Sequence, residues 1–214
     1  MGHSKASKAD THARLVAAAA ARFKERGIDG ISLADLMKDL KLTHGGFYKH
    51  FGSRDELVTE ALQLALAQSG SAMRERLFDK TKPDVPGFIG FYLDESHRSG
   101  RAAGCAVAAL AGDAPRKSAN VQAQFRAQIE SNLEALTVAL ETGGAGLASA
   151  EARATALLVL SALYGALMMA RAVGDSPLSL EVLRSVRKQL SNLTGRRPVK
   201  KARLSRGKMT SRRR

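Results

Sequence analysis

The sequence has no tryptophan, a single cysteine and only 5% aromatic residues among its 214 positions. Because Cys105 has no second cysteine to pair with, an internal disulfide is excluded, and we expect a protein of the reducing cytoplasm. No stretch alternates apolar and polar residues as a strand would. The hydrophobic fraction of 44% is sufficient for a core, and abundant alanine and leucine favour an all-α fold.

Long apolar runs are also scarce. A membrane-spanning helix needs roughly 18 or more apolar residues, and we expect neither such a segment nor a membrane partner. The stretch LVAAAAA near the N-terminus resembles the apolar part of a signal peptide. Because Arg22, Lys24 and Arg26 follow it on the same helical phase, we interpret it as part of a mature helix.

Acidic residues are outnumbered, with 20 Asp and Glu against 34 Lys and Arg and a net charge of +14. Residues 196–214 hold ten of the basic residues and no acidic one, and the remainder of the chain carries a net charge of only +4. We expect residues 195–214 to form a basic disordered tail, because the segment lacks apolar periodicity. Such a tail either solubilises the protein or attracts nucleic acid by counterion release.

Catalytic and metal-binding motifs are missing as well. The five histidines show no H-E-x-x-H spacing, and no glycine-rich phosphate loop or nucleophile elbow occurs. The nearest approach to a catalytic cluster is Asp94, Ser96 and His97, which we interpret as solvated surface. We therefore predict no enzyme activity, no catalytic residue, no metal and no cofactor.

Three helices are predicted in the first fifty residues. Apolar residues recur at helical spacing over residues 15–23, and Gly27 ends this helix. Ser32 with Asp35 forms a capping box that opens a short second helix. Thr43 is placed to cap a third helix after a tight connection. This arrangement is the outline of a helix-turn-helix unit.

The predicted third helix contains two adjacent glycines, each of which costs roughly 0.5–1 kcal/mol inside a helix. When Phe47 and Phe51 face the core, Gly45 and Lys49 point most directly outward. A face with absent side chains beside a cation and hydrogen-bond donors suits close approach to DNA. We interpret the glycines as a means of bringing the backbone near the major groove.

Residues 10–62, DTHARLVAAAAARFKERGIDGISLADLMKDLKLTHGGFYKHFGSRDELVTEAL, resemble the DNA-binding domain of TetR/AcrR-type transcriptional regulators. The resemblance implies a three-helix DNA-binding domain over residues 8–54, joined by a long helix to an effector-binding and dimerisation domain over residues 55–194. The implied DNA-binding residues are Ser32, Thr43, His44, Gly45, Gly46, Tyr48, Lys49, His50 and Arg54, the last as a phosphate clamp. His44 stands where the family has a basic residue, which leaves the base preference open.

The resemblance also implies a pocket for a small effector in the C-terminal half. The candidate residues are Phe88, Phe91, Tyr92, Cys105, Phe125, Tyr164 and Met168. Few charges interrupt these stretches, which favours an apolar or weakly polar effector, although the same residues could form an ordinary core. Cys105 could sense oxidants, but its small apolar surroundings are typical of an inert buried thiol.

The last two predicted helices, from about Ala150 to Val173 and from Pro177 onward, match the position at which the family dimerises. Small residues at helical spacing in the first of them, Ser161, Ala162, Gly165 and Ala166, permit close helix packing between or within chains. We therefore expect a homodimeric, ligand-responsive repressor of a palindromic DNA operator. The alternative is an architectural nucleoid-type protein that binds DNA through its tail with little sequence preference.

Overall fold

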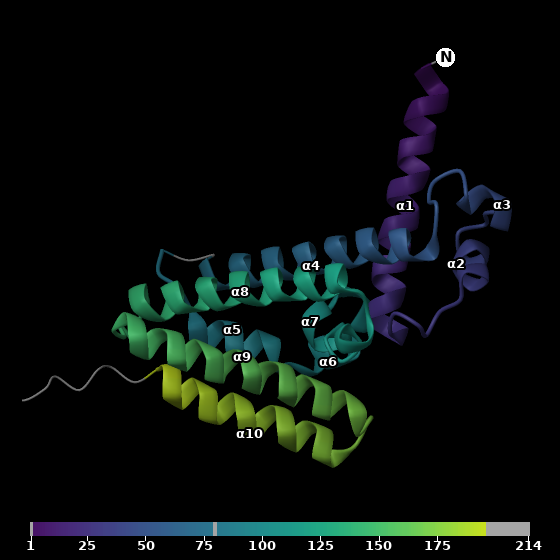
Figure 1. Ribbon diagram of the computed structural model, residues 1–214. Helices are drawn as coiled ribbons and strands as arrows, with labels where there is room; N and C mark the ends of the chain where they lie inside the picture. The colour runs from purple at the N-terminus through teal and green to yellow at the C-terminus, as the bar shows by residue number, and fades with distance from the viewer. Residues whose placement is uncertain (1, 79–80, 196–214) are drawn as a thin grey trace, which may run out of the picture.

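The computed structural model describes residues 2–78 and 81–195, and within these ranges all regular secondary structure is helical (Figure 1). The predicted all-α fold is therefore confirmed. The elements are α1 (Gly2–Arg26), α2 (Leu33–Asp39), α3 (His44–Phe47), α4 (Arg54–Phe78), α5 (Val85–Tyr92), α6 (Glu95–Ser99), η1 (Arg101–Ala103), α7 (Ala106–Leu110), η2 (Ala114–Arg116), α8 (Ala119–Thr142), α9 (Ser149–Ala172) and α10 (Pro177–Thr194), where η denotes a 3₁₀ turn.

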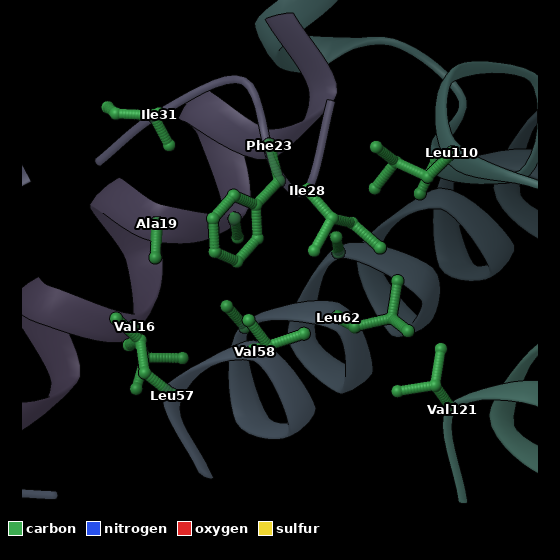
Figure 2. Close-up of a cluster of buried hydrophobic side chains, with 14 of the residues drawn as sticks. Val16, Ala19, Phe23, Ile28, Ile31, Leu57, Val58, Leu62, Leu110 and Val121 are labelled. Carbon is green, nitrogen blue, oxygen red and sulfur yellow. The ribbon is translucent and has the colours of Figure 1, made fainter. Parts of the chain in front are cut away.

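The N-terminal helices pack around one apolar cluster, part of which is drawn in Figure 2. The predicted face of α1 is buried there, with Phe23 2% exposed and Leu15 fully covered. Gly27 ends α1 with a φ of +85°, a left-handed conformation that glycine adopts without steric cost. Leu110 of α7 and Val121 of α8 belong to the same cluster, so the core continues from the N-terminal helices into the C-terminal half.

The long helix α4 connects the two halves. One end of α4 crosses α1, and the rest of the helix runs beside α8 (Figure 1). The first turn of α4 is stabilised by Ser53, whose hydroxyl accepts the Glu56 N–H, while the Glu56 carboxylate accepts the Gly52 N–H at 2.6 Å. This is a capping box, and it fixes the point at which the chain leaves the N-terminal helices.

The C-terminal half is a layered helical bundle. Helix α8 lies between α4 and α9, and α10 runs along the other side of α9 (Figure 1). Helices α5 and α6 are separated at Asp94, because Asp94 caps a new helix by accepting the Ser96 N–H. The division of the chain at residue 54 remains a prediction, and residues 196–214 of the predicted tail lie outside the described residues.

Helix α9 is the most apolar long helix of the structure. Its length and mean hydropathy of 1.6 would allow it to cross a membrane, so the expectation that no segment reaches this character is wrong for α9. The helix packs against α8 and α10 in the structure, and 39% of its apolar window is buried. A core helix of a soluble bundle has the same character, so this is weak evidence for membrane insertion.

Candidate DNA-binding surface and effector cavity

The second helix begins as the sequence predicts. Ser32 accepts the Asp35 N–H at 3.1 Å and donates its hydroxyl proton to the Asp35 carboxylate at 2.6 Å. Leu36 and Met37 are buried against α1 and α4. The side chain of Ser32 therefore stabilises the start of α2, and a contact between Ser32 and DNA remains a prediction.

The connection between α2 and α3 depends on one residue with a positive φ. Lys41 has a φ of +54°, its N–H bonds the Lys38 carbonyl at 3.0 Å, and the next N–H, of Leu42, bonds the Met37 carbonyl at 2.9 Å. These two bonds form a Schellman motif, which satisfies the last carbonyls of α2 and reverses the chain. Lysine at the left-handed position is unusual, because its Cβ is strained there.

Helix α3 is shorter than the predicted third helix. Regular α-helix covers only residues 44–47, and the chain then continues through turns to Phe51, whose N–H bonds the Phe47 carbonyl at 3.1 Å. Gly45 and Gly46 therefore lie in a first turn and not in a helix interior, where their cost would be greater. Thr43 caps this turn by accepting the Gly46 N–H at 3.2 Å, as expected.

The outward surface of α3 has the predicted composition. Phe47 and Phe51 are buried and stack with their ring centroids 5.3 Å apart. Gly45 faces open space, since a Cβ built on it meets no atom within 4 Å. Tyr48 is 60% exposed and Lys49 is exposed beside it. The packing of the fold therefore leaves room for a side chain at position 45.

His50 is half-buried at the edge of this surface. Its Nδ1 atom is buried without a hydrogen-bond partner among the described residues. Burial, together with the positive charges of neighbouring groups, lowers the pKa of the His50 imidazole. Any hydrogen bond to a phosphate would therefore come from the Nε2 atom of a largely neutral ring. The side chain of His44 lies outside the described residues, so its predicted contact is not placed.

Arg54 contacts the loop between α1 and α2. Its Nη2 atom donates to the Ile28 carbonyl at 2.6 Å and to the Ile31 carbonyl at 3.3 Å, and its Nη1 atom lies 3.6 Å from Asp29 Oδ1. The guanidinium is thus turned toward the loop between α1 and α2, where carbonyl oxygens replace phosphate as acceptors. Arg54 therefore has a structural role in this conformation, and a contact between Arg54 and DNA remains a prediction.

One contact that supports α3 was missed in the sequence. His12 of α1 stacks on Phe51 with a centroid distance of 4.5 Å, and its Nε2 lies 2.7 Å from the Glu60 carboxylate of α4. These three residues join α1, α4 and the turn after α3. His12 and Glu60 are 48 positions apart in the sequence, so no local pattern predicts their contact.

A cavity lies in the C-terminal half between α4, α5, α8 and α9. The centres of water molecules can occupy about 80 Å³ of this cavity, which is room for several waters. The residues around it are Ser69, Ala72, Met73, Phe88, Phe91, Tyr92, His97, Ala103, Gly104, Cys105, Asn132, Leu160 and Tyr164. None of them carries a fixed charge, so the cavity suits an uncharged and mainly apolar molecule.

Polar groups are placed at several points of the cavity wall. The Tyr92 hydroxyl is buried and meets no hydrogen-bond partner of good geometry among the described residues. Burial, together with the nearby Cys105 thiol, raises the pKa of this phenol well above its usual value. The Tyr164 hydroxyl accepts from Asn132 Nδ2 at 3.0 Å, and burial raises the pKa of Tyr164 as well. Both phenols therefore remain neutral and able to donate a hydrogen bond.

His97 fixes one side of the cavity. Its Nδ1 atom donates to the Tyr92 carbonyl at 2.7 Å, and its Nε2 accepts the Cys105 N–H at 3.1 Å. Both ring nitrogens are used by a neutral imidazole, and burial lowers the pKa of His97 further. His97 was predicted as solvated surface, and the structure contradicts that interpretation. The residue instead joins α5 to the turn that carries Cys105.

Five of the seven predicted pocket residues surround this cavity, and two do not. Phe125 is 4% exposed within the N-terminal apolar cluster, so it supports the core. Met168 is 45% exposed and borders a different hollow. Phe125 and Met168 were misplaced for the same reason. An apolar residue on a helix can face either of two neighbouring helices, and the sequence does not say which. Ser69, His97 and Asn132 were missed because they are polar.

No group of three or more His, Cys, Asp or Glu residues is arranged to hold a metal ion within residues 2–78 and 81–195.

The sequence was also compared with known families. Residues 15–61 match the family described as bacterial regulatory proteins, tetR family, and residues 84–189 match the C-terminal domain described as transcriptional regulator LmrA/YxaF-like. The chain belongs to the TetR family. It is accordingly a DNA-binding transcriptional regulator with a helix-turn-helix domain, and α2 and α3 are the helices of that motif.

Solved structures of TetR-family regulators share the fold. A regulator from Chloroflexus aurantiacus is 23% identical with a TM-score of 0.75, over 89% of this chain and 97% of that one. The reduced form of Escherichia coli NemR is 21% identical with a TM-score of 0.70, over 86% and 96%. SCO4454 from Streptomyces coelicolor is 20% identical with a TM-score of 0.65, over 92% and 97%. Among proteins with curated annotation, none matches.

Proposed function

We propose that this TetR-family protein is a homodimeric, cytoplasmic, ligand-responsive repressor that places α3 of each chain in the major groove of a palindromic operator. The observation that carries the proposal is the open surface at Gly45, which the fold leaves free although a side chain would fit. Exposed Lys49 and Tyr48 flank this surface and can reach phosphates. Gly45 then serves close approach of the backbone to the base pairs.

A second copy of the chain is the partner best suited to the outer face of α9. This face is apolar but exposed, with Leu157 at 50%, Leu158 at 55% and Met169 at 59%. Ser161 and Gly165 lie between these residues, and a Cβ on Gly165 would meet nothing within 4 Å. Large side chains around a small-residue gap permit two helices to approach closely. The two copies of α9 and α10 would form a four-helix bundle.

Twofold symmetry sets the spacing of the operator. Both recognition helices must reach the same face of the duplex, so the half-sites lie about 34–36 Å apart, one helical turn, or a multiple of that distance. The operator is therefore expected to be a palindrome whose centre carries no direct base contact from this motif.

The effector proposed for this protein is uncharged and mainly apolar, and it occupies the cavity beside Tyr92. Its one polar group would accept a hydrogen bond from the Tyr92 hydroxyl, which meets no partner of good geometry among the described residues. Ser69 and Met73 of α4 lie against the cavity, and α4 continues to the helix-turn-helix. An effector that favours a shifted α4 lowers the population of the DNA-binding state by its differential affinity for the two states.

The Gly45→Leu variant tests the DNA-binding surface directly. Its side chain enters open space, so the melting temperature should stay within about 2 °C of wild type, while operator affinity should fall at least about tenfold. Gly45→Ala is the matched control, with an intermediate loss of affinity. Fluorescence anisotropy with DNA from the region upstream of the gene measures the operator affinity of both variants. Wild-type affinity in Gly45→Leu would overturn the assignment of this surface.

A further inference from the structure

One lysine of α1 is buried without an acidic partner. Lys24 is only 7% exposed, a rare state for an unpaired ammonium group. It borders a hollow of about 310 Å³ together with Arg101 of η1 and Arg171 of α9. A second hollow of about 190 Å³ adjoins the first and shares both arginines. Three cations from three separate elements therefore converge on one place.

The nearby carboxylates are engaged elsewhere. Glu25 is 2.9 Å from Arg22. Asp113 is 2.8 Å from Arg116 and also accepts the Ile28 N–H at 3.1 Å.

Asp175 lies 3.1 Å from Arg98. In the part of the chain that the structure describes, no carboxylate lies within salt-bridge distance of Lys24, Arg101 or Arg171. Glu25 also borders the hollow, but its carboxylate is paired with Arg22, so the three cations leave the hollow with a net positive charge.

Arg171 is held in a fixed orientation. Its Nε donates to the Arg98 carbonyl at 3.1 Å and its Nη2 donates to the His97 carbonyl at 2.9 Å. Two backbone acceptors thus position the guanidinium and leave further N–H groups for another acceptor. Because an oriented guanidinium loses little conformational freedom on binding, it suits a carboxylate or phosphate ligand.

Glu25 and Gly27 also border the hollow, and the remaining wall is apolar. It is formed by Ala108, Ala109, Met168 and Ala172. A bare inorganic ion would leave this surface exposed to water, whereas a short hydrocarbon chain would cover it.

We propose that the hollow between α1, α7 and α9 binds a small organic anion, with its carboxylate or phosphate on Lys24, Arg101 and Arg171 and its apolar part against Met168 and Ala109. The site shares no residue with the effector cavity. A bound anion contacts both α1, which packs on the helix-turn-helix, and α9, so it couples the positions of these two helices. The site does not depend on the effector proposal.

Calorimetric titration of the full chain at constant ionic strength tests the site, with hexanoate as the probe. One hexanoate should bind per chain, and 1-hexanol, which lacks the charge, should bind at least about tenfold more weakly. Lys24→Met and Arg101→Gln should each weaken hexanoate binding by about tenfold or more. Arg101 is exposed, so its replacement is not expected to disturb folding even if Lys24→Met does.

Arg126→Gln provides the matched control, because it removes one exposed charge from α8 away from the hollow. It should bind hexanoate as wild type does, and any general attraction of anions to the basic residues 196–214 is common to all these proteins. Absence of saturable hexanoate binding would overturn the proposal. Equal affinities in wild type, Lys24→Met and Arg101→Gln would overturn it as well.

Discussion

Replacing Arg54 by alanine distinguishes its structural role from a role in phosphate binding. The guanidinium donates to two carbonyls of the loop between α1 and α2, whose anchors Ile28 and Ile31 are 0% and 3% exposed. A hydrogen bond from a charged group is worth about 1.5–3 kcal/mol net. The bond at 3.3 Å is long, and the side chain is 34% exposed, so we count roughly one full bond.

The Arg54→Ala variant should therefore lose about 1–3 kcal/mol of unfolding free energy. With a urea m value of about 2–3 kcal/mol/M, the unfolding midpoint falls by roughly 0.3–1.5 M. Arg126→Ala, which also removes an exposed arginine, should leave the midpoint unchanged. The salt dependence of operator binding should keep its slope in Arg54→Ala. An unchanged midpoint together with a slope smaller by about 0.9 would refute this reasoning, since that is the signature of a lost phosphate contact.

Three further experiments give defined outcomes. Lys41→Gly should raise the unfolding free energy by about 0.5–1 kcal/mol, because it relieves the strained φ of +54°. Lys38→Gly, inside α2, should instead lower the unfolding free energy by about 1 kcal/mol. Urea unfolding of both variants checks the sign of each change. Met169→Glu should convert a dimer to monomers in light scattering, and an unchanged mass would exclude α9 as the interface. The pKa of His97 is lowered in the folded protein, so wild-type stability should fall as pH drops below about 6.5 and should fall less in His97→Gln; identical pH profiles would contradict this.

Local features of the helix-turn-helix could be predicted from the sequence. Capping side chains act within three or four residues, so Ser32 and Thr43 were located correctly from spacing alone. The buried faces of α1 and α3 follow from helical periodicity in the same way. The length of α3 could not be read, because glycines and turn residues continue the helical phase after regular hydrogen bonding ends.

Contacts between distant segments were the part that spacing did not reveal. The partners of Arg54 lie in a loop more than twenty positions earlier, and the partners of His12 and His97 are set by packing. The direction in which Phe125 and Met168 face depends on which helices surround α8 and α9. A sequence pattern assigns a residue to a helical face, whereas the bundle decides whether that face meets core, cavity or surface.

Sequence-specific DNA binding is the central claim, and a salt series tests it most directly. The full chain and a chain ending at Gly195 should be titrated with DNA flanking the gene and with scrambled DNA; this endpoint preserves α10, in which Thr194 is 2% exposed. We predict saturable binding of both proteins at one palindromic site, with scrambled DNA weaker by about 10³-fold or more. Binding that ignores sequence and disappears with residues 196–214 would contradict the account and favour the architectural alternative.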